Sequence, residues 1–252
     1  MNNNNTNIKF DLELQHAMGY NGNIPKSIIL HNNLVEYLYI AGSYIVSTEM
    51  NEPNKQSILR GHDDVVTCMT LSNNGKLLAT GQKGDNSDIL VWEYEQKRII
   101  FKLSEHDYEI SCLKFSHDDK FLFSCGTDKR LFIWDMKNGY IVANCPCYPQ
   151  PTNDIAWGGF VRDGRGNNTP NYQLATCGKN VVALWSLDCT EGVLDKQVIT
   201  TGNFLRDYIC LTFSLNEEKF LYAGIYIIIR ITLINNYFRN NIWRHRLLFS
   251  KK

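Results

Sequence analysis

Three side chains in the middle of the chain have the types that a nucleophilic hydrolase uses. His106, Ser124 and Asp128 would supply a base, a nucleophile and an orienting carboxylate if the fold brought them together. The sequence shows no G-x-S-x-G elbow around Ser124 and no recognisable oxyanion hole. The same residue types also form hydrogen-bonded structural chains in half-buried positions, and we favour that interpretation. A hydrolase is kept as the remote alternative.

Other chemistry has less support. Cys145 and Cys147 form the only close pair among eight cysteines, and no second pair or neighbouring histidine completes the four-ligand spacing of structural zinc. Neither G-x-x-x-x-G-K-[ST] nor G-x-G-x-x-G occurs, so nucleotide binding has no motif to support it. We therefore predict no catalytic residue, no metal, no cofactor and no small-molecule substrate.

Charge and composition limit the partners. Lys+Arg and Asp+Glu are both 26 among 252 residues, so no whole-surface attraction draws the chain to nucleic acid or to a membrane. The residues after Met1 are polar, with no apolar core of a signal peptide, and no apolar run reaches the roughly 18 to 20 residues of a membrane span. The cysteines then suit a reducing compartment, and we expect a soluble cytoplasmic chain with protein partners.

The elements that position these side chains repeat. Residues 65–81 read VVTCMTLSNNGKLLATG, residues 109–126 read EISCLKFSHDDKFLFSCG, and residues 208–224 read YICLTFSLNEEKFLYAG. Each has an apolar-Cys-apolar alternation, a Ser, a polar turn, a Lys and a second apolar run. The apolar position before the Ser is Leu71, Phe115 and Phe213, with Trp157 equivalent in a weaker fourth copy. The first two intervals lie in the low forties, and the last is longer because that copy contains an insertion.

A third apolar run follows each pair and contains Trp92, Trp134 or Trp185. The runs are short, rich in β-branched and aromatic residues, and separated by turn residues, with no helix signal. A period in the low forties with about four short strands is typical of a propeller blade. The predicted fold is all-β, made of four-stranded antiparallel blades.

The repeats resemble the WD40 family through the Gly61-His62 pair, the Trp134-Asp135 pair and the similar intervals from His62 to Trp92 and from His106 to Trp134. The resemblance covers roughly residues 24–224. It implies that each blade is locked by a polar chain from a His through a Ser or Thr to an Asp and the Trp. The members of these chains would be His106, Ser124, Asp128 and Trp134 in one unit, and His62, Thr80 and Trp92 in the unit before it.

Two units depart from this pattern. Asn86 stands where the earlier unit should have its Asp, so that chain is either incomplete or completed by Asp85 or Asp88. The unit around Trp185 has no Gly-His opening, and we expect it to rely on packing. It also contains an inserted polar loop, residues 162–171, whose Arg162 and Arg165 make it either a solvated loop or a candidate partner loop.

The extent of the repeats divides the chain into a polar segment 1–19, a partial propeller 20–224 and an Ile/Asn/Arg-rich tail 225–252. Seven blades of about 42 residues need roughly 290, whereas residues 24–224 number 201, enough for about four and a half to five blades of an incomplete ring.

The tail also separates the charges. It carries six basic side chains and no acidic one, so residues 1–224 hold 20 basic and 26 acidic side chains and have a net charge of −6. Our hypothesis for the tail is a truncated or mis-spliced gene model. The alternatives are a basic partner-binding tail, through which alone nucleic acid could bind, and an amphipathic membrane-surface segment, against which the β-branched start of the tail argues. Ile225 to Ile231 could also add a makeshift third strand to the last blade.

The order of the repeat units indicates a more specific resemblance within the WD40 proteins. An NGxxP opening, a Gly-Gln followed by a long turn, and KFLFSCGTDKRLFIWD are similar to the N-terminal part of the family of cilia- and flagella-associated protein 52. That family implies a non-enzymatic scaffold inside the doublet microtubules of the axoneme, with multivalent contacts to tubulin and other inner proteins. The alternative is a general WD40 adaptor in a ubiquitin-ligase or trafficking complex.

Overall fold

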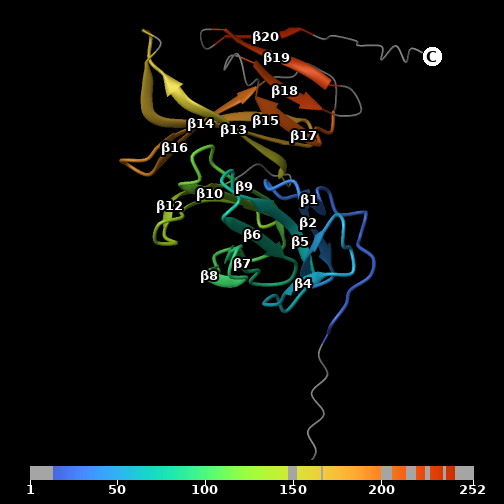
Figure 1. Ribbon diagram of the computed structural model, residues 1–252. Coiled ribbons are helices and arrows are strands. Elements are labelled where there is room, and N and C mark those ends of the chain that lie inside the picture. The colour runs from blue at the N-terminus through green and yellow to red at the C-terminus, as the bar shows by residue number, and fades with distance from the viewer. Residues whose placement is uncertain are drawn as a thin grey trace, which may run out of the picture.

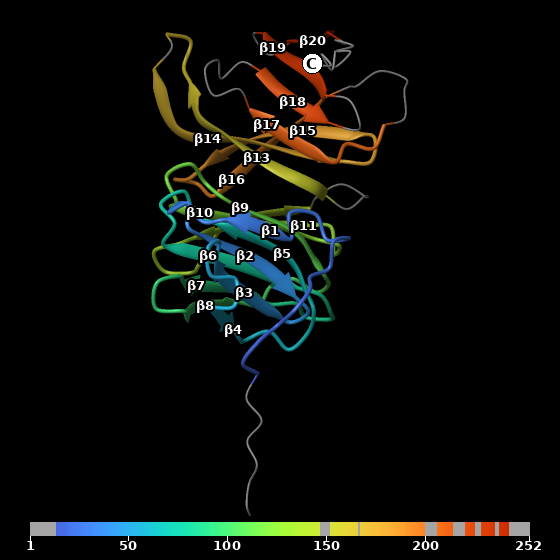
Figure 2. The same ribbon diagram turned by 45° about the vertical axis from the view of Figure 1, so that its right-hand side comes forward.

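The computed structural model describes residues 14–146, 152–165, 167–199, 206–213, 220–224, 228–234 and 237–241. In this part of the chain the regular elements are all strands, and no helix is long and apolar enough to cross a membrane. The strands form five four-stranded antiparallel sheets, each a meander in chain order. The prediction of propeller blades is confirmed, and the sheets make an open arc instead of a closed ring (Figures 1 and 2).

The bounds of the strands follow the repeat. The first sheet contains β1 (Ile28–Leu30), β2 (Glu36–Ala41), β3 (Tyr44–Glu49) and β4 (Gln56–Leu59). The second contains β5 (Val66–Leu71), β6 (Leu77–Gln82), β7 (Ile89–Glu93) and β8 (Arg98–Leu103). The third contains β9 (Ile110–Phe115), β10 (Phe121–Gly126), β11 (Arg130–Asp135) and β12 (Ile141–Pro146). The fourth contains β13 (Thr152–Arg162), β14 (Asn168–Gly178), β15 (Val181–Asp188) and β16 (Val193–Ile199). The fifth contains β17 (Cys210–Phe213), β18 (Phe220–Gly224), β19 (Ile228–Ile234) and β20 (Tyr237–Asn241).

The repeated serine explains one part of the pattern. Ser72 Oγ accepts from the backbone N–H of Leu77 at 2.8 Å, and Ser116 Oγ accepts from that of Phe121 at 3.0 Å. Both hydroxyls therefore hold the turn between the first and second strands of their sheets. Ser214, the third copy, lies outside the described residues.

The core lies between the sheets. One cluster of buried side chains fills each of the four junctions between consecutive sheets, and β5, β9, β13 and β17 contact one another in that order. A middle strand such as β10 is buried on both faces, so its sequence FLFSCG is apolar almost throughout. Phe123 packs edge-to-face on Trp157 of the next sheet, with ring centroids 5.7 Å apart.

The N-terminal segment covers the outer face of the first sheet. Ala17 exchanges hydrogen bonds with Gln56 of β4, and its carbonyl also accepts from Tyr39 Oη of β2 at 3.0 Å. Arg60 donates to the carbonyl of Leu14 at 2.6 Å. The segment runs beside β1 to β4 in Figures 1 and 2. The segment, expected only as a polar lead, is thus held by hydrogen bonds at Leu14 and Ala17 beside the first sheet.

The fifth sheet extends into the Ile/Asn/Arg-rich tail. β19 pairs with β18, with Ile228 opposite Gly224, and β20 pairs with β19. Ile229 and Ile231 therefore belong to a third strand, as one of the alternatives for the tail supposed, while Ile225 and Ile227 lie outside the described residues. The division at residues 19 and 224 stays a prediction.

The expected polar loop 162–171 is wrong in its extent. β13 and β14 are each 11 residues long and form a hairpin that projects beyond β15, at the upper left of Figures 1 and 2. Arg162 pairs with Asn168, so the connection shortens to residues 163–167. β-branched and aromatic residues on both sides of the polar stretch favour strand, and Asp163 Oδ1 holds the tip by accepting from the N–H groups of Arg165 and Asn167.

A single carboxylate links distant sheets. Asp154 of β13 is 4% exposed and lies 2.5 Å from Lys26 Nζ, from the loop before β1. Its other oxygen accepts from the backbone N–H of Leu211 in β17 at 2.9 Å. Asp154 thus connects the first, fourth and fifth sheets across the concave side of the arc.

We expect Asp154→Asn to lower the free energy of unfolding by about 1–3 kcal/mol, because Lys26 loses its counter-charge and the Leu211 N–H can face an amide donor. Urea titration of the purified chain measures the change. Asp195→Asn, at an exposed position of β16, is the matched control and should have little effect. An equal loss for both variants would contradict the role of Asp154.

Candidate functional site

The third sheet contains a complete polar chain. Trp134 Nε1 donates to Ser124 Oγ at 2.9 Å, Ser124 Oγ lies 2.9 Å from His106 Nε2, and His106 Nδ1 lies 2.8 Å from Asp128 Oδ2. A carboxylate can only accept, so Nδ1 carries the proton, Nε2 accepts from the Ser124 hydroxyl, and every bond in the chain has a donor. The chain joins the segment before β9 to β10, the following turn and β11.

Asp128 is held as an anion by its surroundings. Burial raises its pKa, but hydrogen bonds from His106, from the N–H of Arg130 at 2.9 Å and from the N–H of Asp107 at 3.2 Å outweigh that effect, and the net pKa is lowered. The arrangement also fixes the turn, in which Lys129 has φ 63°. The carboxylate therefore pins both the imidazole and the β10–β11 connection.

This geometry serves structure better than hydrolysis. Ser124 is 0% and His106 1% exposed, and Ser124 Oγ already accepts from the Trp134 indole. A nucleophile must reach a substrate carbon and an oxyanion hole, and Ser124 faces only its own sheet's polar chain. The three residues are in the order of a triad, but they are sealed within the blade.

The second sheet also contains a polar hydrogen-bonded chain. The residue that accepts the last hydrogen bond in it is one that the sequence analysis did not predict. Trp92 Nε1 donates to Thr80 Oγ1 at 2.8 Å, and His62 Nε2 lies 2.6 Å from the same oxygen. His62 Nδ1 then meets Gln82 Oε1 at 2.7 Å. An amide oxygen accepts from Nδ1–H as a carboxylate does, so Gln82 completes the chain.

The expectation of an incomplete chain, or of Asp85 or Asp88 as its acceptor, was therefore wrong. Asn86 donates its backbone N–H to the carbonyl of Asp107, and Asp88 accepts from Ser104 Oγ at 2.5 Å and pairs with Lys102. The turn after β6 is longer than its counterpart, and Asp88 in it bonds to Ser104 and Lys102 instead of to His62. The Gly-Gln dipeptide was the available signal, because it places an acceptor at the end of β6 beside the histidine.

The fourth sheet retains one bond of the chain. Trp185 Nε1 donates to Thr176 Oγ1 at 2.9 Å, and Lys196 Nζ lies 5.2 Å from the centroid of the indole. No histidine stands in the described residues directly before β13. This sheet depends on packing around Trp185, which is 2% exposed.

The repeated cysteines act as small core residues where a further sheet covers them. Cys68 and Cys112 are buried, and each thiol faces a carbonyl of the next sheet, that of Ile110 at 3.6 Å and that of Thr152 at 3.8 Å. Burial raises the pKa of Cys68 strongly, so its thiol stays protonated. Cys210, which we grouped with them, is exposed because no described sheet packs on the outer face of the fifth.

The side chains that bind metal ions do not cluster in the described part of the structure. Among the residues that the structure describes, no group of three or more His, Cys, Asp or Glu side chains is placed to hold an ion. Cys145 is half-buried at the end of β12, and Cys147 lies outside the described residues.

The candidate partner loop is displayed at the end of the β13–β14 hairpin. Arg162 and Arg165 are both exposed there, the first at the end of β13 and the second in the turn. Tyr172 Oη donates to Asp118 at 2.7 Å. The hairpin is thus anchored by side chains while its tip reaches into solvent. The rings that pack at its base are those of His117, Phe160, Tyr172 and Phe121.

Comparison with known proteins identifies the class. The model of the WD domain, G-beta repeat, matches residues 53–93 and 97–135, which hold the polar chains of the second and third sheets. The chain therefore contains WD40 repeats, as its sequence predicted.

The comparison also yields similar proteins. "Cilia- and flagella-associated protein 52" of Chlamydomonas reinhardtii is 31% identical over 218 residues, which cover 84% of this chain and 34% of that protein. The human protein of the same name is 25% identical over 219 residues, covering 85% and 34%. "WD repeat-containing protein 90" of Mus musculus is 25% identical over 182 residues, covering 70% and 9%. The chain spans about a third of the length of the relatives with the cilia- and flagella-associated name.

We expect Ser124→Ala to lower the free energy of unfolding by about 1–3 kcal/mol, because it leaves the Trp134 N–H and His106 without their shared partner. Thermal or urea unfolding measures the loss. Ser57→Ala, at an exposed residue of β4, is the control and should be near neutral. A neutral Ser124→Ala would show that the polar chain does not stabilise the blade.

We also expect stability to depend on pH through His62. Burial lowers the pKa of His62 below its usual range, so the unfolded chain binds a proton more readily than the folded one. The contribution of neutral His62 to the free energy of unfolding is therefore fully present above the ordinary His pKa of about 6.5, and it decreases as the pH drops below that value. Urea titrations at several pH values between neutral and mildly acidic should show a shallower fall for His62→Asn than for the unaltered chain. Equal slopes would contradict this role.

Proposed function

We propose that the chain is a non-enzymatic WD40 scaffold of motile cilia and flagella, in which rigid blades present loops to several protein neighbours at once. The main observation behind the proposal is that all three triad-like side chains form structural hydrogen bonds inside one blade. His106, Ser124 and Asp128 satisfy one another away from solvent, so maintaining the blade's shape explains their presence without turnover.

The likeness to relatives named as cilia- and flagella-associated proteins supports the location. The finer expectation is a position inside axonemal doublet microtubules, with contacts to tubulin and other inner proteins. The projecting β13–β14 hairpin supports this part of the proposal, since its exposed Arg162 and Arg165 suit an acidic protein surface. Contacts of this kind at several loops add through effective concentration.

Axonemal retention tests the proposal. A tagged copy of the chain, expressed in a ciliated or flagellated cell, should stay with the axoneme after detergent extraction. A diffuse cytosolic signal would overturn the ciliary assignment and favour the cytosolic adaptor.

The hairpin can be tested in the same cells. The double variant Arg162→Ala/Arg165→Ala should weaken retention at raised salt, because it removes two charges from the proposed contact. The fold should be unaffected, since both side chains are exposed at the end of the hairpin. Lys137→Ala/Lys83→Ala, two exposed lysines outside the hairpin, is the charge-matched control. Equal retention of the two double variants would remove the hairpin from the proposed contact.

A further inference from the structure

The concave side of the arc contains two hollows that share one charged junction. The first, of about 390 Å³, follows β1, β5 and β9, and the second, of about 430 Å³, follows β9, β13 and β17. Three residues line both: Lys26, Asn73 and Lys114. The hollows are therefore two halves of one surface along the first strands of the sheets.

The charge of this surface is opposite to that of the chain around it. Lys26, Lys114 and His117 are the ionisable residues among those that line the hollows, and none of these lining residues is acidic. Residues 1–224 together carry a net charge of −6. An acidic body with a basic concave strip favours an anionic occupant at that strip.

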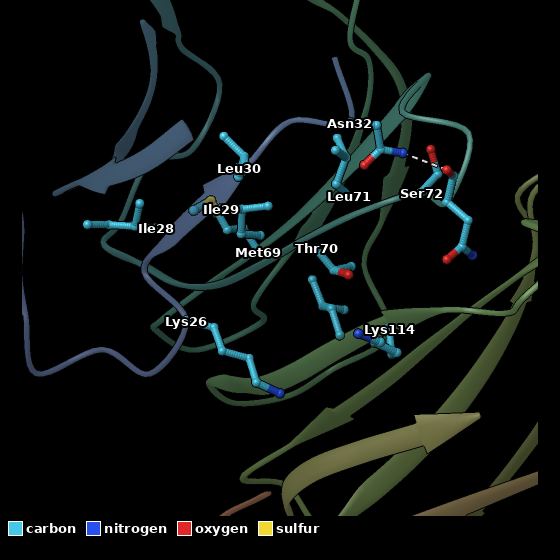
Figure 3. A pocket seen from close by; sticks show the side chains of 12 residues that line it. Lys26, Ile28, Ile29, Leu30, Asn32, Met69, Thr70, Leu71, Ser72 and Lys114 are labelled. Atoms are coloured by element: carbon cyan, nitrogen blue, oxygen red, sulfur yellow. Dashed lines mark hydrogen bonds between the residues drawn. The ribbon is translucent and has the colours of Figure 1, made fainter. Parts of the chain in front are cut away.

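The two lysines differ in their partners. Lys26 is neutralised by Asp154, at 2.5 Å. Lys114 Nζ has no hydrogen bond or ion pair with any described residue, and the surrounding protein and the charge of Lys26 lower its pKa by more than Asp154 raises it. Figure 3 shows Lys26 and Lys114 reaching the same pocket from the loop before β1 and from β9. Lys114 is also exposed, so one uncompensated ammonium stands open to solvent between the two hollows, and it matches one carboxylate.

The hollows on either side of the junction each contain apolar side chains among polar ones. Ile28 and Leu30 line the first hollow and are 46% and 44% exposed. Trp157 and Phe213 line the second. In an extended peptide, side chains two positions apart point the same way at a spacing of about 7 Å. A peptide with an acidic residue between two apolar ones, each two positions away, therefore fits the order of wall, ammonium and wall.

We propose that the concave side of the arc binds an extended peptide segment of a partner protein, with an acidic side chain on Lys114 and apolar side chains in the two hollows. The site goes beyond the scaffold role, and it needs neither the ciliary location nor the hairpin contact.

A binding assay on the purified chain tests this site. The probe is a fluorescein-labelled pentapeptide, Leu-Ser-Glu-Ser-Leu, with an amidated C-terminus so that the Glu is its only peptide carboxylate. The matched probe replaces the Glu with Gln. We expect the Glu probe to bind at least about tenfold more tightly by fluorescence anisotropy, since its carboxylate pairs with the free ammonium. Equal affinities would overturn the proposal.

Variants of the protein assign the charge. Lys114→Met should reduce the affinity for the Glu probe to that for the Gln probe, whereas Lys114→Arg should retain most of it. Lys83→Met, at an exposed position after β6, is the control and should bind as the unaltered chain does. A Lys114→Met variant with unchanged thermal unfolding and unchanged binding would overturn the role of Lys114.

Competition separates the peptide from a free anion. Glutarate supplies a carboxylate without apolar neighbours, and it should displace the Glu probe only at concentrations far above that of the unlabelled peptide. Displacement at equal concentrations would make the site one for small carboxylates and the peptide proposal wrong. None of these outcomes bears on axonemal retention, so the two proposals fail separately.

Discussion

Face-to-face packing of consecutive sheets is the constraint on which the rest of the structure depends. A four-stranded sheet of this repeat is apolar on both faces, so it is buried only when a neighbour lies on each side. The third sheet meets this condition and has the most complete polar chain. The end sheets do not meet it within the described residues, and their differences follow from that. Cys210 is exposed where Cys68 and Cys112 are buried, and Ala17 lies over a face that a sheet would otherwise cover.

The same packing dictates the polar chains. An indole N–H and an imidazole taken into the interior cost several kcal/mol if they lack partners, so each must find one inside its own blade. Ser124 and Thr80 act as the common partner because a hydroxyl accepts from the indole and donates to the imidazole at once. The final acceptor is less constrained, since it needs only an oxygen facing Nδ1. Asp128 supplies it in one blade and Gln82 in the other.

Those differences explain what could be predicted from the sequence. Strand runs, their period and the positions of Trp92, Trp134 and Trp185 follow local rules, and each of these tryptophans lies in the third strand of its sheet as expected. Gln82 was missed because the prediction held the carboxylate fixed at an interval before the tryptophan, while the longer turn changed that interval. The contact between Lys26 and Asp154, which are far apart in the sequence, depends on how strongly the arc curves, and no local pattern encodes that.

The curvature also decides the electrostatics of the concave side. The inner strands converge, so the loop before β1 comes within reach of β13, and a lysine that would be an ordinary surface charge in an isolated blade is brought beside a second one. Asp154 compensates one of the two charges while also holding Leu211, and it cannot serve both ammonium groups. The position of Lys114 beside Lys26, with no counter-charge of its own, is thus a consequence of assembling the sheets, and this arrangement lasts only as long as the first, third and fourth sheets keep their places.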